Sequence, residues 1–124
     1  MKLHHLAFRT TDVDGLVRFY REVLGFVEVR DSRPRSVWLA IGDDAVLMVE
    51  AREGGESPIP DVSMELVAFA VDDAGKAAVK AEALRRGCFD GETDSTVYLR
   101  DPDGRRLGVS VYVFGRERTS GESS

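Results

Sequence analysis

The chain has 124 residues, of which 43% are hydrophobic and 31% charged, and its formal net charge is −5. This length suits one domain of ordinary globular composition. The acidic balance argues against nucleic acid or a membrane surface as the main partner, and no apolar stretch is long enough to cross a bilayer. A strand predicted almost from Met1 leaves no room for a signal peptide, and the lone Cys88 cannot form an internal disulfide. We therefore expect a cytoplasmic protein.

The first half of the chain is predicted to fold as a strand, a helix and three more strands. Residues 3–9 alternate in polarity, which predicts a strand with Leu6 and Phe8 on its core face. Asp12 is a suitable N-cap for an amphipathic helix that ends at Gly25. The three further strands are expected over residues 26–30, 37–41 and 45–51.

The second half repeats the first. Leu6 corresponds to Val67 and Asp12 to Asp73, an offset of 61 residues (67 minus 6 and 73 minus 12). The repeat predicts a strand over 64–71, a helix capped by Asp72 or Asp73 that ends at Gly87, a short strand over 88–91, and strands over 96–100 and 105–113 joined by a turn at 101–104. The helix is expected to face its sheet with a stripe of small residues, Ala74, Ala77, Ala78, Ala81 and Leu84.

This order of elements predicts an α+β fold of two βαβββ modules, each a mixed four-stranded sheet covered on one face by its helix. The expected organisation is one domain over residues 1–115, with module one at 1–51, a Gly- and Pro-containing linker at 52–63, module two at 64–113 and a disordered tail at 116–124. The uncovered faces should form a cupped cavity. Alternation along the strands assigns to it His5, Ala7, Arg9, Ser36, Trp38, Ala40, Leu66, Ala68, Ala70, Thr96, Tyr98, Arg100, Arg106, Gly108, Ser110 and Tyr112.

Three segments together resemble a known superfamily. They are His5-Leu-Ala-Phe-Arg-Thr-Thr-Asp12, Phe19-Tyr-Arg-Glu-Val-Leu-Gly-Phe26 and Tyr98-Leu-Arg-Asp-Pro-Asp-Gly104. The chain is similar over residues 3–113 to the vicinal oxygen chelate superfamily, which includes glyoxalase I, extradiol dioxygenases, methylmalonyl-CoA epimerase and the fosfomycin and bleomycin resistance proteins. The resemblance implies paired βαβββ modules around a cup-shaped cavity, often in a homodimer. It does not select one activity.

The resemblance also implies where a divalent metal (Mn, Fe, Ni or Zn) would be held in metal-dependent members. His5 matches the position on the first strand, whereas Leu66 and Gly108 occupy two other usual ligand positions. The fourth position falls near Leu47 or Met48, and only a shift or bulge would bring Glu50 there. Because protein metal sites need three or more donors, we expect no complete metal site.

Each candidate residue has a second interpretation. His5 is a ligand contact, general base or metal ligand, or else a partly solvated strand residue, and Glu50 is a general base or a strand end that reaches solvent. Trp38 stacks on a ligand or packs in a core or interface, and Arg9 binds a ligand anion or pairs with a neighbouring acid. Tyr98 and Tyr112 contact a ligand or are ordinary strand aromatics, and Ser110 lies on the same predicted face.

Two functions remain open from the sequence. The first is a metal-free protein that binds a small organic molecule through His5, Arg9, Trp38, Tyr98, Ser110 and Tyr112. The second is a small-molecule enzyme, a lyase, isomerase or dioxygenase, with His5 and Glu50 as catalytic candidates, either around a divalent metal or without one. A homodimer is expected in either case.

Overall fold

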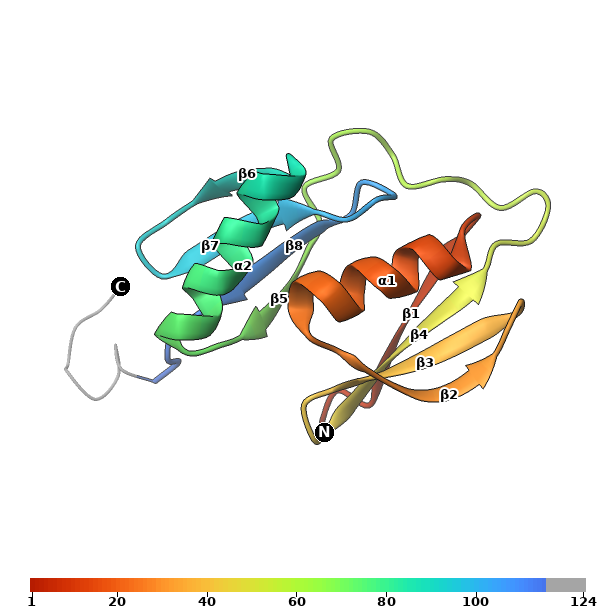
Figure 1. The fold of residues 1–124 in the computed structure, drawn as a ribbon, viewed down its shortest axis with the longest axis horizontal. Helices are drawn as coiled ribbons and strands as arrows, with labels where there is room; N and C mark the ends of the chain where they lie inside the picture. The colour runs from red at the N-terminus through yellow and green to blue at the C-terminus, as the bar shows by residue number, and fades with distance from the viewer. Residues whose placement is uncertain (116–124) are drawn as a thin grey trace. The chain divides into compact units, whose positions relative to one another are not determined.

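The computed structural model describes residues 1–115 and shows the order βαβββ twice (Figure 1). The first module contains β1 (His5–Thr10), α1 (Val13–Leu24), β2 (Val27–Ser32), β3 (Ser36–Ile41) and β4 (Ala45–Ala51). The second contains β5 (Leu66–Ala70), α2 (Asp73–Arg86), β6 (Phe89–Glu92), β7 (Thr96–Arg100) and β8 (Arg106–Ser110). The predicted α+β fold of two βαβββ modules is confirmed. The tail predicted over 116–124 lies outside the described residues.

Each module builds one four-stranded mixed sheet. Sheet A has the strand order β1-β4-β3-β2, with β1 parallel to β4 and the other pairs antiparallel. Sheet B repeats this arrangement in the order β5-β8-β7-β6, with β5 parallel to β8. In sheet A the register pairs Arg9 with Glu50, Ser36 with Glu50, and Trp38 with Met48. This register determines which side chains meet on the face described below.

Helix α1 forms where the sequence supplies a cap at each end. The Asp12 side chain accepts a hydrogen bond from the Gly15 N–H, and Gly25 adopts the left-handed conformation, with φ 74°, that ends the helix. The apolar side of α1 is buried against sheet A (Figure 1), and it includes Leu16 and Tyr20, which are 1% and 0% exposed. The helix predicted between Asp12 and Gly25 agrees with the structure.

Helix α2 also has the predicted caps, Asp72 and Gly87, but the prediction of its buried face was wrong. Val79 and Ala83 are its buried residues, and Leu84 is 55% exposed. The other members of the predicted stripe, Ala74, Ala77, Ala78 and Ala81, are all exposed. Burying an alanine side chain removes little apolar area from water, so the regular alanine pattern did not determine which face of α2 is buried.

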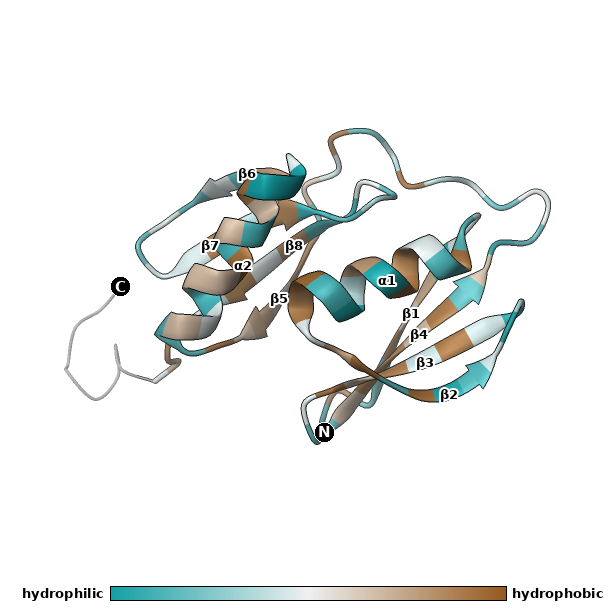
Figure 2. Ribbon diagram, in the orientation of Figure 1, coloured by the Kyte–Doolittle hydropathy of each residue, from teal (hydrophilic) through white to brown (hydrophobic). Residues whose placement is uncertain are grey.

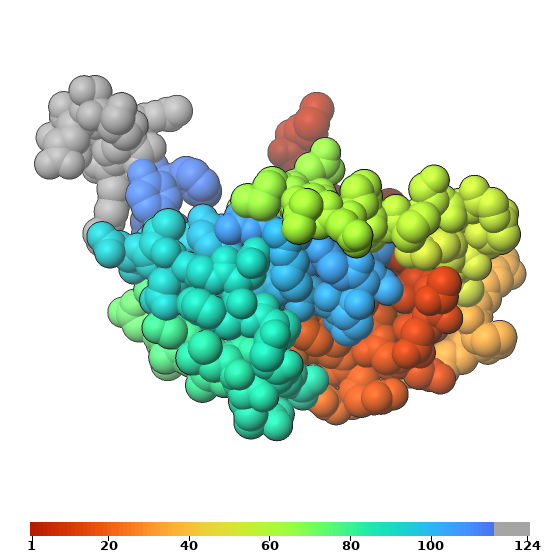
Figure 3. Space-filling view, turned by 90° about the horizontal axis from the view of Figure 1, so that it is seen from above, coloured from red at the N-terminus to blue at the C-terminus, as the bar shows by residue number. Residues whose placement is uncertain are grey.

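The chain divides into two compact units that do not follow the sequence halves. One unit comprises Met1–Glu65 together with Arg100–Arg105, and the other comprises Leu66–Leu99 and the described residues that follow Arg105. The turn after β7 therefore belongs to the first unit. Within that unit the buried Tyr20 hydroxyl donates to Asp101 Oδ2 at 2.8 Å, and the Arg105 guanidinium lies 4.6 Å from the Phe8 ring. Residues 52–65 run over the surface (yellow-green in Figure 3).

Candidate functional site

The side chains of sheet A separate into a covered and an open face. Leu39, Leu47 and Val49 have no exposed surface and lie on the face that α1 covers. Since strand side chains alternate, Met48 and Glu50 point to the open face. The open face also carries His5, Ala7, Arg9, Arg30, Ser32, Ser36, Trp38, Ala40 and Val46.

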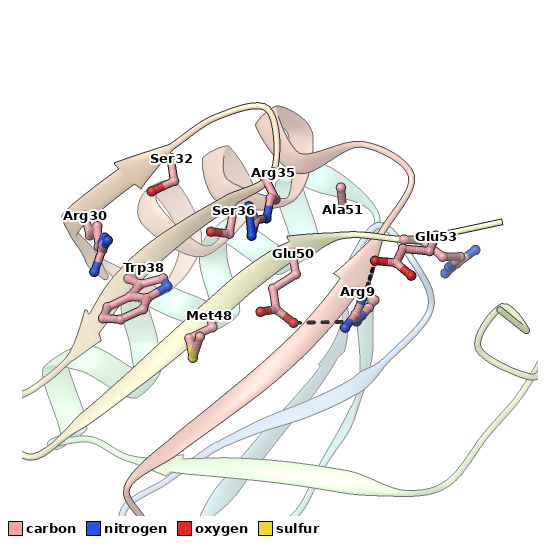
Figure 4. A pocket seen from close by; sticks show the side chains of 11 residues that line it. Arg9, Arg30, Ser32, Arg35, Ser36, Trp38, Met48, Glu50, Ala51 and Glu53 are labelled. Atoms are coloured by element: carbon pink, nitrogen blue, oxygen red, sulfur yellow. Dashed lines mark ion pairs between the residues drawn. The ribbon is translucent and has the colours of Figure 1, made fainter.

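A hollow of about 590 Å³ lies on this open face (Figure 4). Its lining comprises Arg9, Arg30, Ser32, Arg35, Ser36, Trp38, Met48, Glu50, Ala51, Arg52 and Glu53. We call this the sheet A hollow. All of these residues belong to the first unit. The volume falls within the range of about 300–1,000 Å³ that is usual for sites of small molecules and cofactors.

Trp38 forms the aromatic part of the sheet A hollow. It is half-buried and pairs across the sheet with Arg30 on one side and with Met48 on the other. The Arg30 guanidinium lies 4.8 Å from the centre of the Trp38 ring, which is a cation–π contact. Of the two interpretations that the sequence left open, the structure therefore places Trp38 on the open face and not in the core of sheet A.

Arg9 is surrounded by carboxylates. Its guanidinium lies 3.5 Å from Glu50, 3.9 Å from Glu53 and 3.2 Å from Glu56 (Figure 4 shows the first two). The sequence left open whether Arg9 binds a ligand anion or pairs with a neighbouring acid, and the structure shows the pairing. Three carboxylates share this one guanidinium, so the positive charge of Arg9 is more than compensated.

The structure separates the two catalytic candidates, His5 and Glu50. In the β1–β4 register His5 is the partner of Val46, and Glu50 lies four residues further along β4. At about 3.3 Å per residue this is a separation of about 13 Å along the strand. His5 does not line the hollow, and its Nδ1 lies 2.9 Å from Nδ1 of His4. Within sheet A these two side chains cannot share one cation.

The positions that the family resemblance assigns to metal ligands carry poor donors. Of the two residues near the position on β4, Leu47 is buried and Met48 lies on the open face, while Leu66 lies on β5 and Gly108 on β8. A Cβ placed on Gly108 would be 3.3 to 3.5 Å from carbon atoms of Thr96, Ala68 and Leu66, so its surroundings are apolar. Over residues 1–115 no group of three or more His, Cys, Asp or Glu side chains is placed to hold a metal ion. These residues do not fit a divalent cation.

The open face of sheet B carries two of the predicted site residues, Tyr98 and Ser110. The Arg106 guanidinium lies 4.0 Å from the Tyr98 ring, and its Nε is 3.1 Å from Asp90. The Ser110 hydroxyl accepts a hydrogen bond from the Thr96 hydroxyl at 2.8 Å. These polar groups satisfy one another within the second unit.

Tyr112 does not lie on the strand where the sequence placed it. Strand β8 ends at Ser110, because the next backbone N–H groups bind elsewhere. The Val111 N–H donates to the Ser95 carbonyl, and the Tyr112 N–H donates to the Ser110 hydroxyl. Tyr112 is 46% exposed and packs edge-on against Phe114 at 5.3 Å.

Three arginines of the hollow were missed by the sequence analysis. Arg30 lies on the edge strand β2, beside a register irregularity between Glu28 and Arg30, and Figure 2 shows much of β2 as hydrophilic beside the more hydrophobic β3. Arg35 belongs to the β2–β3 turn, and Arg52 follows β4. A bulge shifts the alternation and turns have none, so no periodic signal pointed to these side chains.

Comparison with known proteins identifies a family and a similar protein. The model of the Glyoxalase/Bleomycin resistance protein/Dioxygenase superfamily matches residues 2–109. The Virulence protein STM3117 of Salmonella typhimurium is 29% identical over an alignment that covers 90% of this chain and 85% of that protein.

Solved structures share the fold. The fosfomycin resistance protein FosX from Mesorhizobium loti has a TM-score of 0.77 and 21% identity, and the match covers 95% of this chain and 97% of that one. The lactoylglutathione lyase from Agrobacterium tumefaciens has a TM-score of 0.64 and 22% identity over 88% of this chain and 92% of that one. At these identities the similarity shows the fold alone. No helix within residues 1–115 is long and apolar enough to span a membrane.

Proposed function

The chain belongs to the Glyoxalase/Bleomycin resistance protein/Dioxygenase superfamily, and on that premise we propose that it binds a small organic molecule in the sheet A hollow. One observation carries the proposal: a hollow of about 590 Å³ brings the half-buried Trp38 and Met48 together with arginine and serine side chains. Trp38 and Met48 offer apolar surface, and the convergent charged and hydroxyl groups around them can orient a bound molecule.

Catalysis around a metal is the weaker alternative. It would need His5 and Glu50 in one coordination sphere, and the register places them about 13 Å apart along the strand direction. Burial raises the pKa of the Cys88 thiol, which disfavours the thiolate that a nucleophile needs. A thermal-shift titration with Mn, Fe(II), Co, Ni and Zn checks this alternative. We expect no stabilisation with any of them, and a large shift that is lost in His5→Ala would favour the enzyme.

The binding proposal is tested by a thermal-shift screen of a compound library that spans several chemical classes. A ligand present at 100 times its Kd stabilises the folded state by about 2.7 kcal/mol, which is a Tm rise of roughly 10 °C for a domain of this size. Ser36→Phe fills the hollow from β3, and the control Ala81→Phe adds the same ring at an exposed position of α2 in the second unit.

We expect hits to stabilise the wild type and Ala81→Phe, but not Ser36→Phe. Equal stabilisation of Ser36→Phe would place the binding site elsewhere. A screen without a hit in any class would contradict the proposal.

A homodimer and a cytoplasmic location remain part of the proposal. Exposed apolar side chains outside the hollow, among them Val27, Val29 and Phe114, offer surface for a second copy. Sedimentation equilibrium should give twice the chain mass, and a mass of one chain at micromolar concentration would contradict the homodimer.

A further inference from the structure

We infer that the molecule bound in the sheet A hollow is a small aromatic acid, with its flat ring against Trp38 and its anionic group toward Arg35. The inference rests on the proposed function, since it names the class of ligand for the same hollow. It follows from the charges that line the hollow and from their order along the strands.

The charge of the hollow is opposite to that of the chain. The chain carries a formal net charge of −5, whereas four arginines and only two glutamates line the hollow. Both glutamates face Arg9, at 3.5 Å and 3.9 Å. The net charge of the lining is therefore +2, and its positive charges away from these glutamates are on Arg30, Arg35 and Arg52.

These three arginines have no carboxylate of their own. Within residues 1–115 none of them lies within ion-pair distance of an Asp or Glu side chain, although Arg33 in the same turn contacts Asp14, Glu28 and Asp31. Arginines that are grouped in a hollow and lack acidic partners repel one another, and a bound anion relieves that repulsion. The anion can be a carboxylate or a phosphate, because both accept paired hydrogen bonds from a guanidinium.

The order of side chains along the strands indicates the shape of the ligand. Arg30, Trp38 and Met48 form one cross-strand row, and Ser32, Ser36 and Glu50 form the next. The two rows are two residues apart, which is about 7 Å. Arg35 points into the hollow beside Ser36 (Figure 4). Glu50, at one end of the second row, is paired with Arg9, so an acidic ligand group fits the other end, at Ser32, Ser36 and Arg35. A ligand that fills both rows therefore has a flat apolar part at Trp38 and an acidic group about 7 Å away.

A fluorescence titration can test this directly, because Trp38 is the only tryptophan of the chain. The probes are phenylpropionate, the neutral phenylpropanamide of the same shape, cyclohexylpropionate with the same charge but no flat ring, and inorganic phosphate. The variants are Arg35→Gln, which removes the anion contact, and the matched control Arg18→Gln, which removes an exposed cation from α1 on the covered side of sheet A.

We expect phenylpropionate to bind at least about ten-fold more tightly than phenylpropanamide, as is usual for a hydrogen-bonded charged group. Arg35→Gln should reduce that ratio to less than about three-fold, while Arg18→Gln should leave it unchanged. Added salt should weaken phenylpropionate binding and leave phenylpropanamide binding unchanged.

Three outcomes would overturn the inference. Equal binding of phenylpropanamide would show that the hollow does not select an anion, although the proposed function would stand. If cyclohexylpropionate or phosphate bound as tightly as phenylpropionate, the hollow would not require a flat ring in its ligand. No binding of any probe would reject the aromatic acid class, and the library screen on Ser36→Phe would then decide the proposed function separately.

Discussion

Replacing Tyr20 with Phe should destabilise the protein through the loss of one buried hydrogen bond. The Tyr20 hydroxyl donates to Asp101 Oδ2 at 2.8 Å, and Tyr20 and the Asp101 side chain are both 0% exposed. Phe preserves the packing of the ring against Phe8, Phe19 and Phe26. The variant therefore tests the polar contact that joins the 101–105 turn to α1.

The magnitude follows from what remains around Asp101. A hydrogen bond to a charged group contributes about 1.5–3 kcal/mol. Asp101 Oδ2 keeps the Arg105 guanidinium at 3.2 Å, and Oδ1 keeps the N–H groups of Asp103 and Arg105. The carboxylate therefore stays partly satisfied, and we expect a loss of about 2 kcal/mol, or a Tm lower by roughly 5–8 °C.

The same contact predicts a pH dependence. Burial, and then the charge and hydrogen bond of Asp101, raise the pKa of Tyr20 well above its usual value. In the unfolded chain a tyrosine loses its proton near pH 10. Above that pH the unfolded state binds fewer protons than the folded state, so stability falls as pH rises, by at most about 1.4 kcal/mol per pH unit. The stability contributed by Tyr20 is thus complete below about pH 10 and is lost above it.

Urea denaturation followed by circular dichroism measures both effects. The control is Tyr112→Phe, which removes a hydroxyl from a 46% exposed side chain and should change stability by less than about 0.5 kcal/mol. The difference between the wild type and Tyr20→Phe should shrink above pH 10. A loss below about 0.5 kcal/mol at neutral pH, or a difference that is constant through alkaline pH, would refute the reasoning.

Three further predictions test the fold by urea denaturation. Ala83→Glu buries a charge at a 0% exposed position of α2 and should lower the free energy of unfolding by about 3 kcal/mol or more. The control Ala81→Glu, on the exposed side of α2, should lower it by less than about 0.5 kcal/mol. Equal effects would contradict the observed buried face of α2. Leu47→Ala leaves a cavity between sheet A and α1 and should cost about 2–5 kcal/mol, and a loss below about 1 kcal/mol would show that this core is not close-packed. Asp12→Ala removes the cap of α1 and should cost about 1 kcal/mol, so an unchanged midpoint would argue against the bond to Gly15.

Local signals were sufficient to predict most of the fold. Asp12 and Gly25 indicated where α1 begins and ends. The regular alternation along β1 and β3 indicated which side chains lie under the helix. Helix α2 shows the limit of this reasoning. Its alanines form a regular stripe, but alanine contributes too little burial free energy to determine a face, and Val79 and Ala83 face the sheet instead.

The candidate site was less predictable. Trp38 was assigned to the open face because β3 alternates regularly. Arg35 and Arg52 come from a turn and from the segment after β4, and their approach to Trp38 depends on the cross-strand register. The contact between Tyr20 and Asp101 joins residues 81 positions apart, and no local pattern encodes a pairing at that separation.

The most direct test of the account is a map of the binding site in solution. With the library compound that raises the Tm most, ¹H–¹⁵N correlation spectra of the wild type should show the single indole N–H signal, that of Trp38, shifting on titration. The backbone amides of Ser36, Met48 and Glu50 should shift with it, because all three line the sheet A hollow. Unchanged signals at these residues, with shifts confined to sheet B around Tyr98, would contradict the assignment of the binding site.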